Sequence, residues 1–368
     1  MSLGLPEVKL TFSAAIARAF SPGADGRMAL IVRDAAQTTG AKIYEITSPD
    51  GLAEAGVTAA AATTEAIRQA FLGGITSLVV VLLATLGEMS AAYDLVETAR
   101  FDVCAVADIA SGEVAGFVAW AKGLYDTDAK HALFVVAEAT APDHPAIVNF
   151  VADDILAADP DDPTTPMAVT QEKFVPRIAG AIAGAKLWEG VTFLKLGDVV
   201  SCAAMTKTNI NAAIAAGKLA LYYNGETVKI ARGVTSLETP TTTYPTPYQK
   251  IKIVRTLNRI EDDIVRNIED NWLGRVPNTV ENKHLLVSAI LDYLQQMEKL
   301  SVLQPGTSTM AIDVVKTRTY LKTIRTAAVV DAMTDEQVLE EDSGDKLYLA
   351  GSIRPVDSVE DIDIAINL

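Results

Sequence analysis

The sequence contains few of the side chains that bind metals or act as nucleophiles. Its 368 residues include two cysteines and three histidines. Cys104 and Cys202 both lie in apolar surroundings, so we expect buried free thiols in a reducing compartment rather than a disulfide. His131, His144 and His284 are far apart, and none stands at metal-ligand spacing from a cysteine or another histidine. We therefore expect structural roles for all three histidines and no metal site.

Long apolar runs and an excess of positive charge are missing too. The longest apolar run, 78–84, falls well short of the roughly 20 residues of a membrane-spanning helix, and is typical of a buried strand. The N-terminus shows no secretory signal pattern. The formal net charge of −16 opposes contact with phosphates, because nucleic-acid binding depends on Lys and Arg. We expect a cytoplasmic protein with no nucleic acid and no membrane among its partners.

The motifs that cradle phosphate or activate a serine are absent as well. The sequence has no G-x-x-x-x-G-K-[ST] loop, no G-x-G-x-x-G after a strand and no G-x-S-x-G turn. Glu261, Asp262 and Asp263 are adjacent, but adjacent positions on a helix diverge by about 100° and do not meet at one ion. We interpret them as a solvated helix face and predict no catalytic residue and no cofactor. An α/β enzyme with an unrecognised site is the alternative.

Short apolar runs alternate with helical patterns from about residue 27 to 235. This alternation is typical of strands that cross over through helices in an α/β layer. The predicted strands are 28–32, 42–47, 77–84, 102–107 and 132–137, and the predicted helices are 64–72, 88–99 and 111–122. The expected fold class here is α/β, with a mixed sheet flanked by helices.

A region of α+β character follows the proline-rich stretch 239–247. Residues 254–268 place apolar side chains at spacings of three and four and charged ones on the other face, which predicts a long amphipathic helix. Closing strands are expected over 346–353 and 359–368, where apolar and polar residues alternate. The whole chain is therefore predicted to be multidomain.

Three local patterns predict further detail. Asn278 with Glu281 predicts a capping box that starts a second helix, and Thr334 with Gln337 predicts the start of a short third one. The run of alanine and glycine at 179–185 could be a ligand loop, but small residues at this spacing favour a helix that packs closely against another backbone. We predict close helix packing.

Both ends of the chain carry the two-residue alternation of a half-buried strand. The apolar positions are Val8, Leu10 and Phe12 near the start and Ile362, Ile364, Ile366 and Leu368 at the end. A terminal strand needs a sheet to join. That sheet is either in the same subunit or in a neighbouring one, and the residues alone leave both possibilities open.

The region from Asp331 onward is strongly acidic, with Lys346 and Arg354 as its only basic residues. One interpretation is a solvated surface that keeps the free subunit soluble. The other is a patch that meets a basic surface on a neighbour, where complementary charge sets the register of assembly.

A series of distinctive segments stands in a fixed order along the chain. The first are GLPEV at 4–8, RMALIVRD at 27–34, FLGG at 71–74 and EKFVPRIAGAIAG at 172–184. They continue with AAGKLAL at 215–221, VKIARGVTSL at 228–237, YQKIKIVRTLNRIEDDI at 248–264, WLGRVPN at 272–278 and NKHLL at 282–286. In this order the segments resemble contractile tail sheath proteins of bacteriophages, prophages and phage-tail-like particles. The resemblance covers nearly the whole chain, which is compact compared with many sheath proteins.

The resemblance implies a structural subunit and not an enzyme. Sheath proteins of this family form rings or a helical sleeve around an inner tube, and contraction drives that tube through a target envelope. The implied partners are further copies of this chain, a tail tube protein, and baseplate and tail terminator proteins. The implied location is the tail of a virion or of a phage-tail-like particle, assembled in the cytoplasm of a bacterial host. A related contractile secretion system, usually built from two different sheath chains, is the alternative.

The sequence patterns and the resemblance together predict five segments. They are an N-terminal arm at 1–20, an outer α/β domain at 21–238, a proline-rich linker at 239–248, an inner α+β domain at 249–355 and a C-terminal β arm at 356–368. In this family the arms extend to neighbouring subunits and complete a sheet there. The resemblance thus implies that the seven alternating apolar residues at the two ends form inter-subunit strands.

Overall fold

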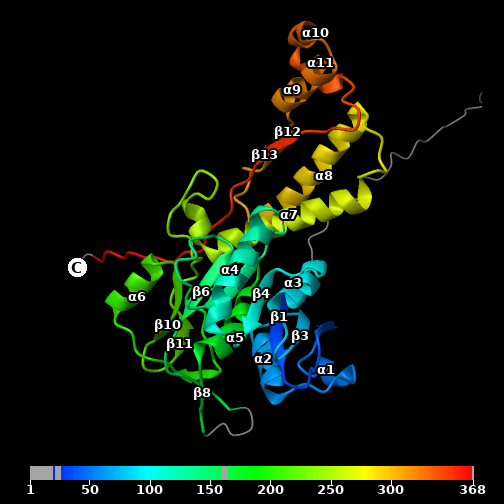
Figure 1. The fold of residues 1–368 in the computed structure, drawn as a ribbon. Helices are drawn as coiled ribbons and strands as arrows, with labels where there is room; N and C mark the ends of the chain where they lie inside the picture. The colour runs from blue at the N-terminus through cyan, green and yellow to red at the C-terminus, as the bar shows by residue number, and fades with distance from the viewer. Residues whose placement is uncertain (1–19, 21–25, 129, 160–164, 367–368) are drawn as a thin grey trace, which may run out of the picture. The chain divides into compact units, whose positions relative to one another are not determined.

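A computed structural model describes Phe20 and residues 26–128, 130–159 and 165–366. These residues form two compact units (Figure 1). The first, the sheet unit, contains the described residues of Gly23–Asp262 and Pro355–Leu368. The second, the helical unit, contains those of Met1–Pro22 and Asp263–Arg354.

The sheet unit is built on an eight-stranded sheet with the strand order β11-β10-β6-β5-β4-β1-β3-β2. Its strands are β1 Arg27–Asp34, β2 Ala41–Ile46, β3 Ser77–Ala84, β4 Val103–Ala107, β5 Leu133–Ala137, β6 Ile147–Val151, β10 Lys218–Tyr223 and β11 Val228–Ile230. The edge strands β2 and β11 pair antiparallel with their neighbours, and the strands between them are parallel. The predicted mixed sheet and its five predicted strands are confirmed.

Helices cover both faces of this sheet, which is why β1 and β3 are apolar at nearly every position. One face packs against α2 (Ala61–Leu72) and α5 (Gln171–Gly184), and the other against α3 (Met89–Thr98) and α4 (Ser111–Asp126). Successive residues of β1 alternate between the two cores: Met28 and Leu30 belong to the first, Ala29 and Ile31 to the second. The three predicted helices are confirmed as α2, α3 and α4.

Two glycines let α5 approach the backbone at the end of α2. A Cβ placed on Gly180 would lie 2.2 Å from the carbonyl oxygen of Ala70, and one on Gly184 would lie 2.2 Å from the carbonyl oxygen of Gly73. Real side chains do not tolerate such distances, so the contact requires residues without a Cβ. The predicted close packing of the small-residue run is confirmed.

Shorter elements complete the sheet unit. A three-stranded sheet has the order β8-β7-β9. Its strands are β8 Met167–Val169, β7 Ile155–Ala157 and β9 Val199–Ser201, and the remaining helices are α1 Gly51–Glu54, α6 Lys207–Ala215 and the 3₁₀ helix η1 Thr246–Gln249. Both predicted free thiols are confirmed, since Cys104 and Cys202 are unpaired and buried.

The helical unit combines helices with a small antiparallel sheet. Its elements after α7 (Ile251–Asn271) are α8 Val280–Lys299, β12 Thr309–Ile312, α9 Val314–Ile324, α10 Ala327–Asp331, α11 Asp335–Glu340 and β13 Leu349–Ser352. Leu286, Ile290, Tyr293 and Met297 of α8 are buried, at the spacing of one helix face. The predicted α+β character is confirmed. No helix in the described ranges is long and apolar enough to span a bilayer.

The two units divide inside α7, between Asp262 and Asp263. The first turns of α7 belong to the sheet unit because Ile251 and Val254 are buried in the core around α2 and α5. The 21–238, 239–248 and 249–355 segments stay a prediction about domain organisation. The two compact units have a different boundary from these segments, because the start of α7 packs with the sheet.

The helix starts show one wrong prediction and one confirmed one. Thr279, not Asn278, caps α8, and its side chain accepts a hydrogen bond from the amide of Asn282. The Asn278 side chain instead donates to the carbonyl oxygens of Gly344 and Lys346, at 2.8 and 3.1 Å, which ties the start of α8 to a distant loop. The Thr334 and Gln337 capping box at α11 is confirmed.

The predicted terminal strands have different outcomes. Residues 8–12 lie outside the described part of the chain. The strand expected over 346–353 is confirmed over its second half as β13, which pairs with β12. Residues 359–366 form no strand in this single chain. A strand requires a ladder partner, so pairing of this segment with another subunit stays a prediction.

The contact between α2 and α5 makes a stability prediction. We expect Gly180→Ala to lower the free energy of unfolding by about 1–3 kcal/mol, because the new methyl group overlaps backbone atoms that cannot move independently. Thermal or urea denaturation measures the loss. Gly116→Ala in α4 is the matched control, because a Cβ there meets no atom within 4 Å and alanine favours a helix. Equal stability of the two variants would contradict the packing argument.

Candidate interaction site

The C-terminal segment, residues 355–366, exposes a row of apolar side chains. Val359, Ile362, Ile364 and Ile366 are 82%, 75%, 74% and 81% exposed. Single exposed apolar residues are common. Ile362, Ile364 and Ile366, however, stand at alternate positions, which is the pattern of a strand that buries one face in a sheet. The segment belongs to the sheet unit, and its described residues Glu360 and Asp361 line a hollow together with residues of α6 (Figure 1).

The small sheet of the helical unit has edges on which no described strand pairs. β12 and β13 pair from Thr309 opposite Ser352 to Ile312 opposite Leu349, and their sheet contains two strands among the described residues. Each strand therefore has one edge on which no described strand pairs. A two-stranded ribbon is marginally stable by itself, and unpaired edges accept further strands.

The predicted strand residues are only partly placed by the structure. Ile362, Ile364 and Ile366 lie together on the C-terminal segment, with their side chains exposed. Val8, Leu10, Phe12 and Leu368 lie outside the described residues. Their role between subunits therefore stays a prediction.

Several acidic residues of the C-terminal region have basic partners within their own unit. In the sheet unit, Lys250 pairs with Asp357 and Glu360, and Arg232 pairs with Glu360 and Asp361. In the helical unit, Asp331 pairs with Lys322, Asp335 with Arg318 and Glu341 with Arg325. This part of the chain is thus more than a solvated acidic surface.

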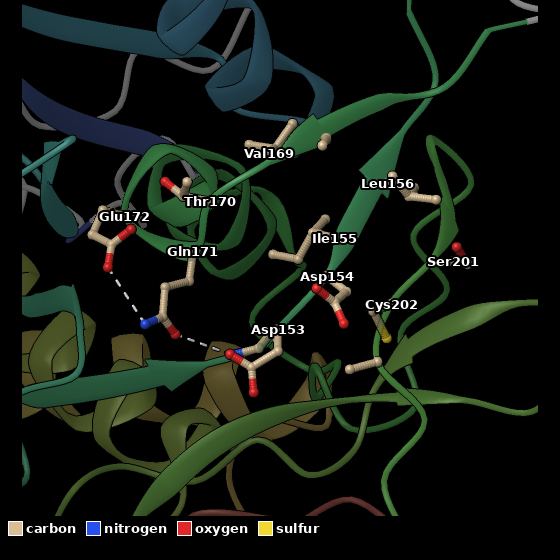
Figure 2. Close-up of a pocket in the computed structure, with 13 residues that line it drawn as sticks. Asp153, Asp154, Ile155, Leu156, Val169, Thr170, Gln171, Glu172, Ser201 and Cys202 are labelled. Atoms are coloured by element: carbon tan, nitrogen blue, oxygen red, sulfur yellow. Dashed lines mark hydrogen bonds between the residues drawn. The ribbon is translucent and has the colours of Figure 1, made fainter.

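A cavity of about 570 Å³ lies in the sheet unit between β7, β8, β9 and the start of α5. Its polar lining includes Asp153, Asp154, Gln171, Glu172 and Cys202 (Figure 2). The Gln171 side chain accepts a hydrogen bond at 3.3 Å from the backbone amide of the residue before Asp153, and donates one to the Glu172 carboxylate at 3.4 Å. Burial raises the pKa of Cys202, and a protonated thiol is a poor nucleophile. The lining therefore presents no nucleophile paired with a base.

A second cavity of about 590 Å³ lies at the carboxyl ends of β1 and β4, where α/β enzymes often bind ligands. One charged side chain beside it, Arg33, already has partners within the fold. Its guanidinium donates to the carbonyl oxygens of Ala84, Thr85 and Gly87 and pairs with Glu113. Arg33 thereby stabilises the loop after β3, and its guanidinium is already bound within the fold.

The histidines and the acidic triplet in α7 also have local partners. The ring of His144 contacts the Asp126 carboxylate at 3.2 Å and accepts from a backbone amide, and His131 lies 2.8 Å from Glu261. No cluster of His, Cys, Asp and Glu within the described ranges could hold a metal ion.

The interpretation of the acidic triplet as a solvated face was wrong for Asp263. Its side chain is fully buried and accepts a hydrogen bond from the Tyr293 hydroxyl at 2.8 Å. Asp262 instead pairs with Arg27 at 3.0 Å, in a network that also joins Asp102 and Arg259. Only Asp263 is buried, since the side chains of Asp262 and Glu261 are 35% and 48% exposed.

Comparison with known sequences identifies the relatives of the chain. Residues 243–368 match the phage tail sheath C-terminal domain. Over 374 aligned residues the chain is 27% identical to the tail sheath protein of Clostridium phage phiCD119, and the alignment covers 99% of both proteins. The resemblance to contractile tail sheath proteins is confirmed.

Solved structures show the same fold. The sheath tail protein of Desulfitobacterium hafniense superimposes with a TM-score of 0.69 at 16% identity, covering 83% of this chain and 94% of that one. The helical sheath of the anti-feeding prophage in its contracted state gives a TM-score of 0.72 at 14% identity, covering 100% and 99%. The predicted mixed architecture is therefore that of sheath proteins.

The buried contact of His144 makes a pH prediction. Burial lowers the pKa of His144, although the Asp126 carboxylate opposes this shift. The unfolded chain then binds a proton more readily below about pH 6.5, so stability is lost as the pH falls through that range. We expect the unfolding temperature to fall on acidification from about pH 7 to about pH 5, and to fall less in His144→Gln.

The matched control is His284→Gln, which removes an exposed imidazole from α8. It should retain the pH dependence of the unchanged protein. If His144→Gln also retains it in full, the buried imidazole does not control acid stability.

Proposed function

We propose, from the premise that this chain is a relative of phage tail sheath proteins, that it is the repeating subunit of a contractile sheath around an inner tail tube. Copies of the chain polymerise into rings or a helical sleeve. Contraction of that sleeve drives the tube through a target envelope. The described residues provide a scaffold with exposed strand-forming segments.

One observation carries the proposal for how the subunits are linked. The described residues include a segment with exposed apolar residues at alternate positions and a two-stranded sheet on whose edges no other described strand pairs. An extended peptide that adds to a sheet edge gains main-chain hydrogen bonds, and its alternate side chains fill pockets. Residues Ile362, Ile364, Ile366 and Leu368 would pair with the sheet of another subunit, and Val8, Leu10 and Phe12 would do so at the other end.

A link of this kind allows the sleeve to change shape without coming apart. The strand stays paired while the bodies of the subunits slide and rotate around it. The extended sleeve is then a metastable state whose free energy is stored in subunit interfaces, and no nucleotide hydrolysis is needed. The partners of Gln171 and Arg33 beside the two cavities support the same role, and we propose that the chain is not an enzyme.

The remaining partners follow from the same role. A tail tube protein lies inside the sleeve, and baseplate and tail terminator proteins bind its two ends. Residues 249–355, with the arms 1–20 and 356–368, form the inner connected layer, and residues 21–238 face outward with 239–248 as the linker. Assembly takes place in the cytoplasm of the bacterial host, and the product is a virion tail or a phage-tail-like particle.

The first test is removal of the proposed arm. We expect a chain that lacks residues 356–368 to stay folded and monomeric but to form no sleeves, because the strand that links subunits is gone. Negative-stain electron microscopy of concentrated protein, alone and with its tail tube protein, measures this. Normal sleeves from the shortened chain would refute the linking role.

A point substitution tests the apolar face of the arm. We expect Ile364→Asp to raise the concentration needed for assembly more than about 100-fold, because a charge would be buried in an apolar pocket. Sedimentation gives this concentration. Asp363→Asn is the matched control, because it changes the neighbouring residue, whose side chain points to the other face of a strand. Equal effects of both substitutions would contradict strand addition.

A sheath made of two different chains, as in contractile secretion systems, is distinguished by the same assay. A sheath subunit of the proposed kind forms sleeves from one chain. A requirement for a second sheath chain would favour the secretion-system alternative.

A further inference from the structure

The start of the C-terminal segment is held on the sheet unit by a group of polar contacts. Glu360 is at their centre, with a side chain only 8% exposed. It accepts a hydrogen bond from the Thr192 hydroxyl at 2.6 Å and pairs with Arg232 and Lys250, each at 3.1 Å. Asp361 adds a contact with Arg232 at 2.6 Å.

Lys250 also pairs with Asp357, so contacts are made over five consecutive residues of the segment. Burial alone would lower the pKa of Lys250, but its hydrogen bonds with Asp357 and Glu360 raise the pKa above the ordinary value. The ammonium group is therefore charged at neutral pH. Carboxylate contacts with charged donors are stronger than neutral hydrogen bonds, above all where water is partly excluded.

The surface that receives these carboxylates is ordered by its own backbone. The Thr192 hydroxyl accepts from the amide of Gly233 at 3.0 Å, and the carbonyl of Gly233 accepts from the amide of Ile251 at 3.1 Å. These bonds place Thr192, Arg232 and Lys250 side by side although they are far apart in sequence. We call Gly190, Thr192, Arg232 and Lys250 the acid cradle.

Gly190 completes the acid cradle by its missing side chain. A Cβ on Gly190 would lie 2.7 Å from the Ser358 hydroxyl oxygen and 3.4 Å from the Ser358 Cβ. The segment thus lies directly against the backbone at this point. Close backbone approach and several charged contacts together describe a shaped binding site rather than scattered surface ion pairs, which contribute little.

We propose that the acid cradle is a binding site for the acidic segment Asp357–Asp361, and that it fixes the point from which Ile362–Ile366 leave the sheet unit. The inference rests on the proposed function, since it assigns Glu360 as a positioning residue for the arm. The contacts end at Asp361, and the alternating isoleucines that follow are exposed. A strand whose start is held in place loses less conformational freedom when it pairs, so the anchor favours assembly.

The first experiment measures how firmly the acid cradle binds its segment in the unassembled subunit. A cysteine at Ser358→Cys is shielded while the segment is bound, so its labelling by a bulky thiol reagent reports the unbound fraction. We expect Glu360→Gln to speed this labelling about tenfold, because a charged acceptor is lost, with no change in the unfolding temperature. Asp363→Asn, beyond the cradle, should leave the rate unchanged. An unchanged rate in Glu360→Gln, or equal rates in the two variants, would overturn the cradle.

The second experiment tests whether the segment remains bound to the acid cradle in the assembled sleeve. The two Cβ positions are 3.4 Å apart. This is just under the roughly 3.5–4.5 Å of a disulfide, so a shift of a few tenths of an ångström lets Gly190→Cys and Ser358→Cys form one. We expect the oxidised double variant to form sleeves as readily as the unchanged chain, and Glu360→Gln to need about tenfold more protein. Loss of sleeves on oxidation, restored by reduction, would overturn the anchoring role.

The two experiments distinguish a failure of this inference from a failure of the proposed function. If the unchanged chain forms no sleeves even with its tail tube protein, the proposed function fails. The labelling rates then still decide whether the acid cradle binds its segment.

Discussion

An extended segment cannot satisfy its own backbone hydrogen bonds, and the rest of this structure depends on how that constraint is met. Inside the sheet unit, eight strands satisfy one another, and helices on both faces bury their side chains. Among the described residues, the C-terminal segment and the small sheet of the helical unit lack further strand partners. In the proposed sleeve, neighbouring subunits supply these partners.

Electrostatics sets the conditions under which this happens. The chain has a formal net charge of −16, so separate copies repel one another at a distance. The acid cradle neutralises part of the acidic segment locally while it leaves the isoleucines exposed. In the proposed assembly, the charges hold the start of the arm, and the apolar face beyond it supplies the free energy of pairing.

The sequence predicts the parts of the fold that repeat a local pattern. The apolar strands β1 and β3, the amphipathic α7 and the close packing of α5 all follow from spacing within one segment. The cap of α8 was wrong by one residue, because Asn278 and Thr279 can both cap a helix and a distant loop engages Asn278. The strands β6, β10 and β11 at one end of the sheet were not among those assigned from the sequence.

The acid cradle was not predictable, because its residues come from separate loops and have no common spacing. Likewise, nothing local marks Asp263 as buried, since its partner Tyr293 is thirty residues away in α8. The exposed alternation at the C-terminus did predict a strand, but the described residues form no ladder with this segment. Contacts between distant segments, within or between subunits, are what pattern reasoning leaves out.

The most direct test of the account is the strand count of one small sheet in an assembled sleeve. A cryo-electron microscopy map of the sleeve should show β12 and β13 extended by further strands, with Ile362, Ile364 and Ile366 of a neighbouring subunit in one of them. A sleeve in which that sheet still has two strands, with both chain ends on their own subunit, would contradict the account.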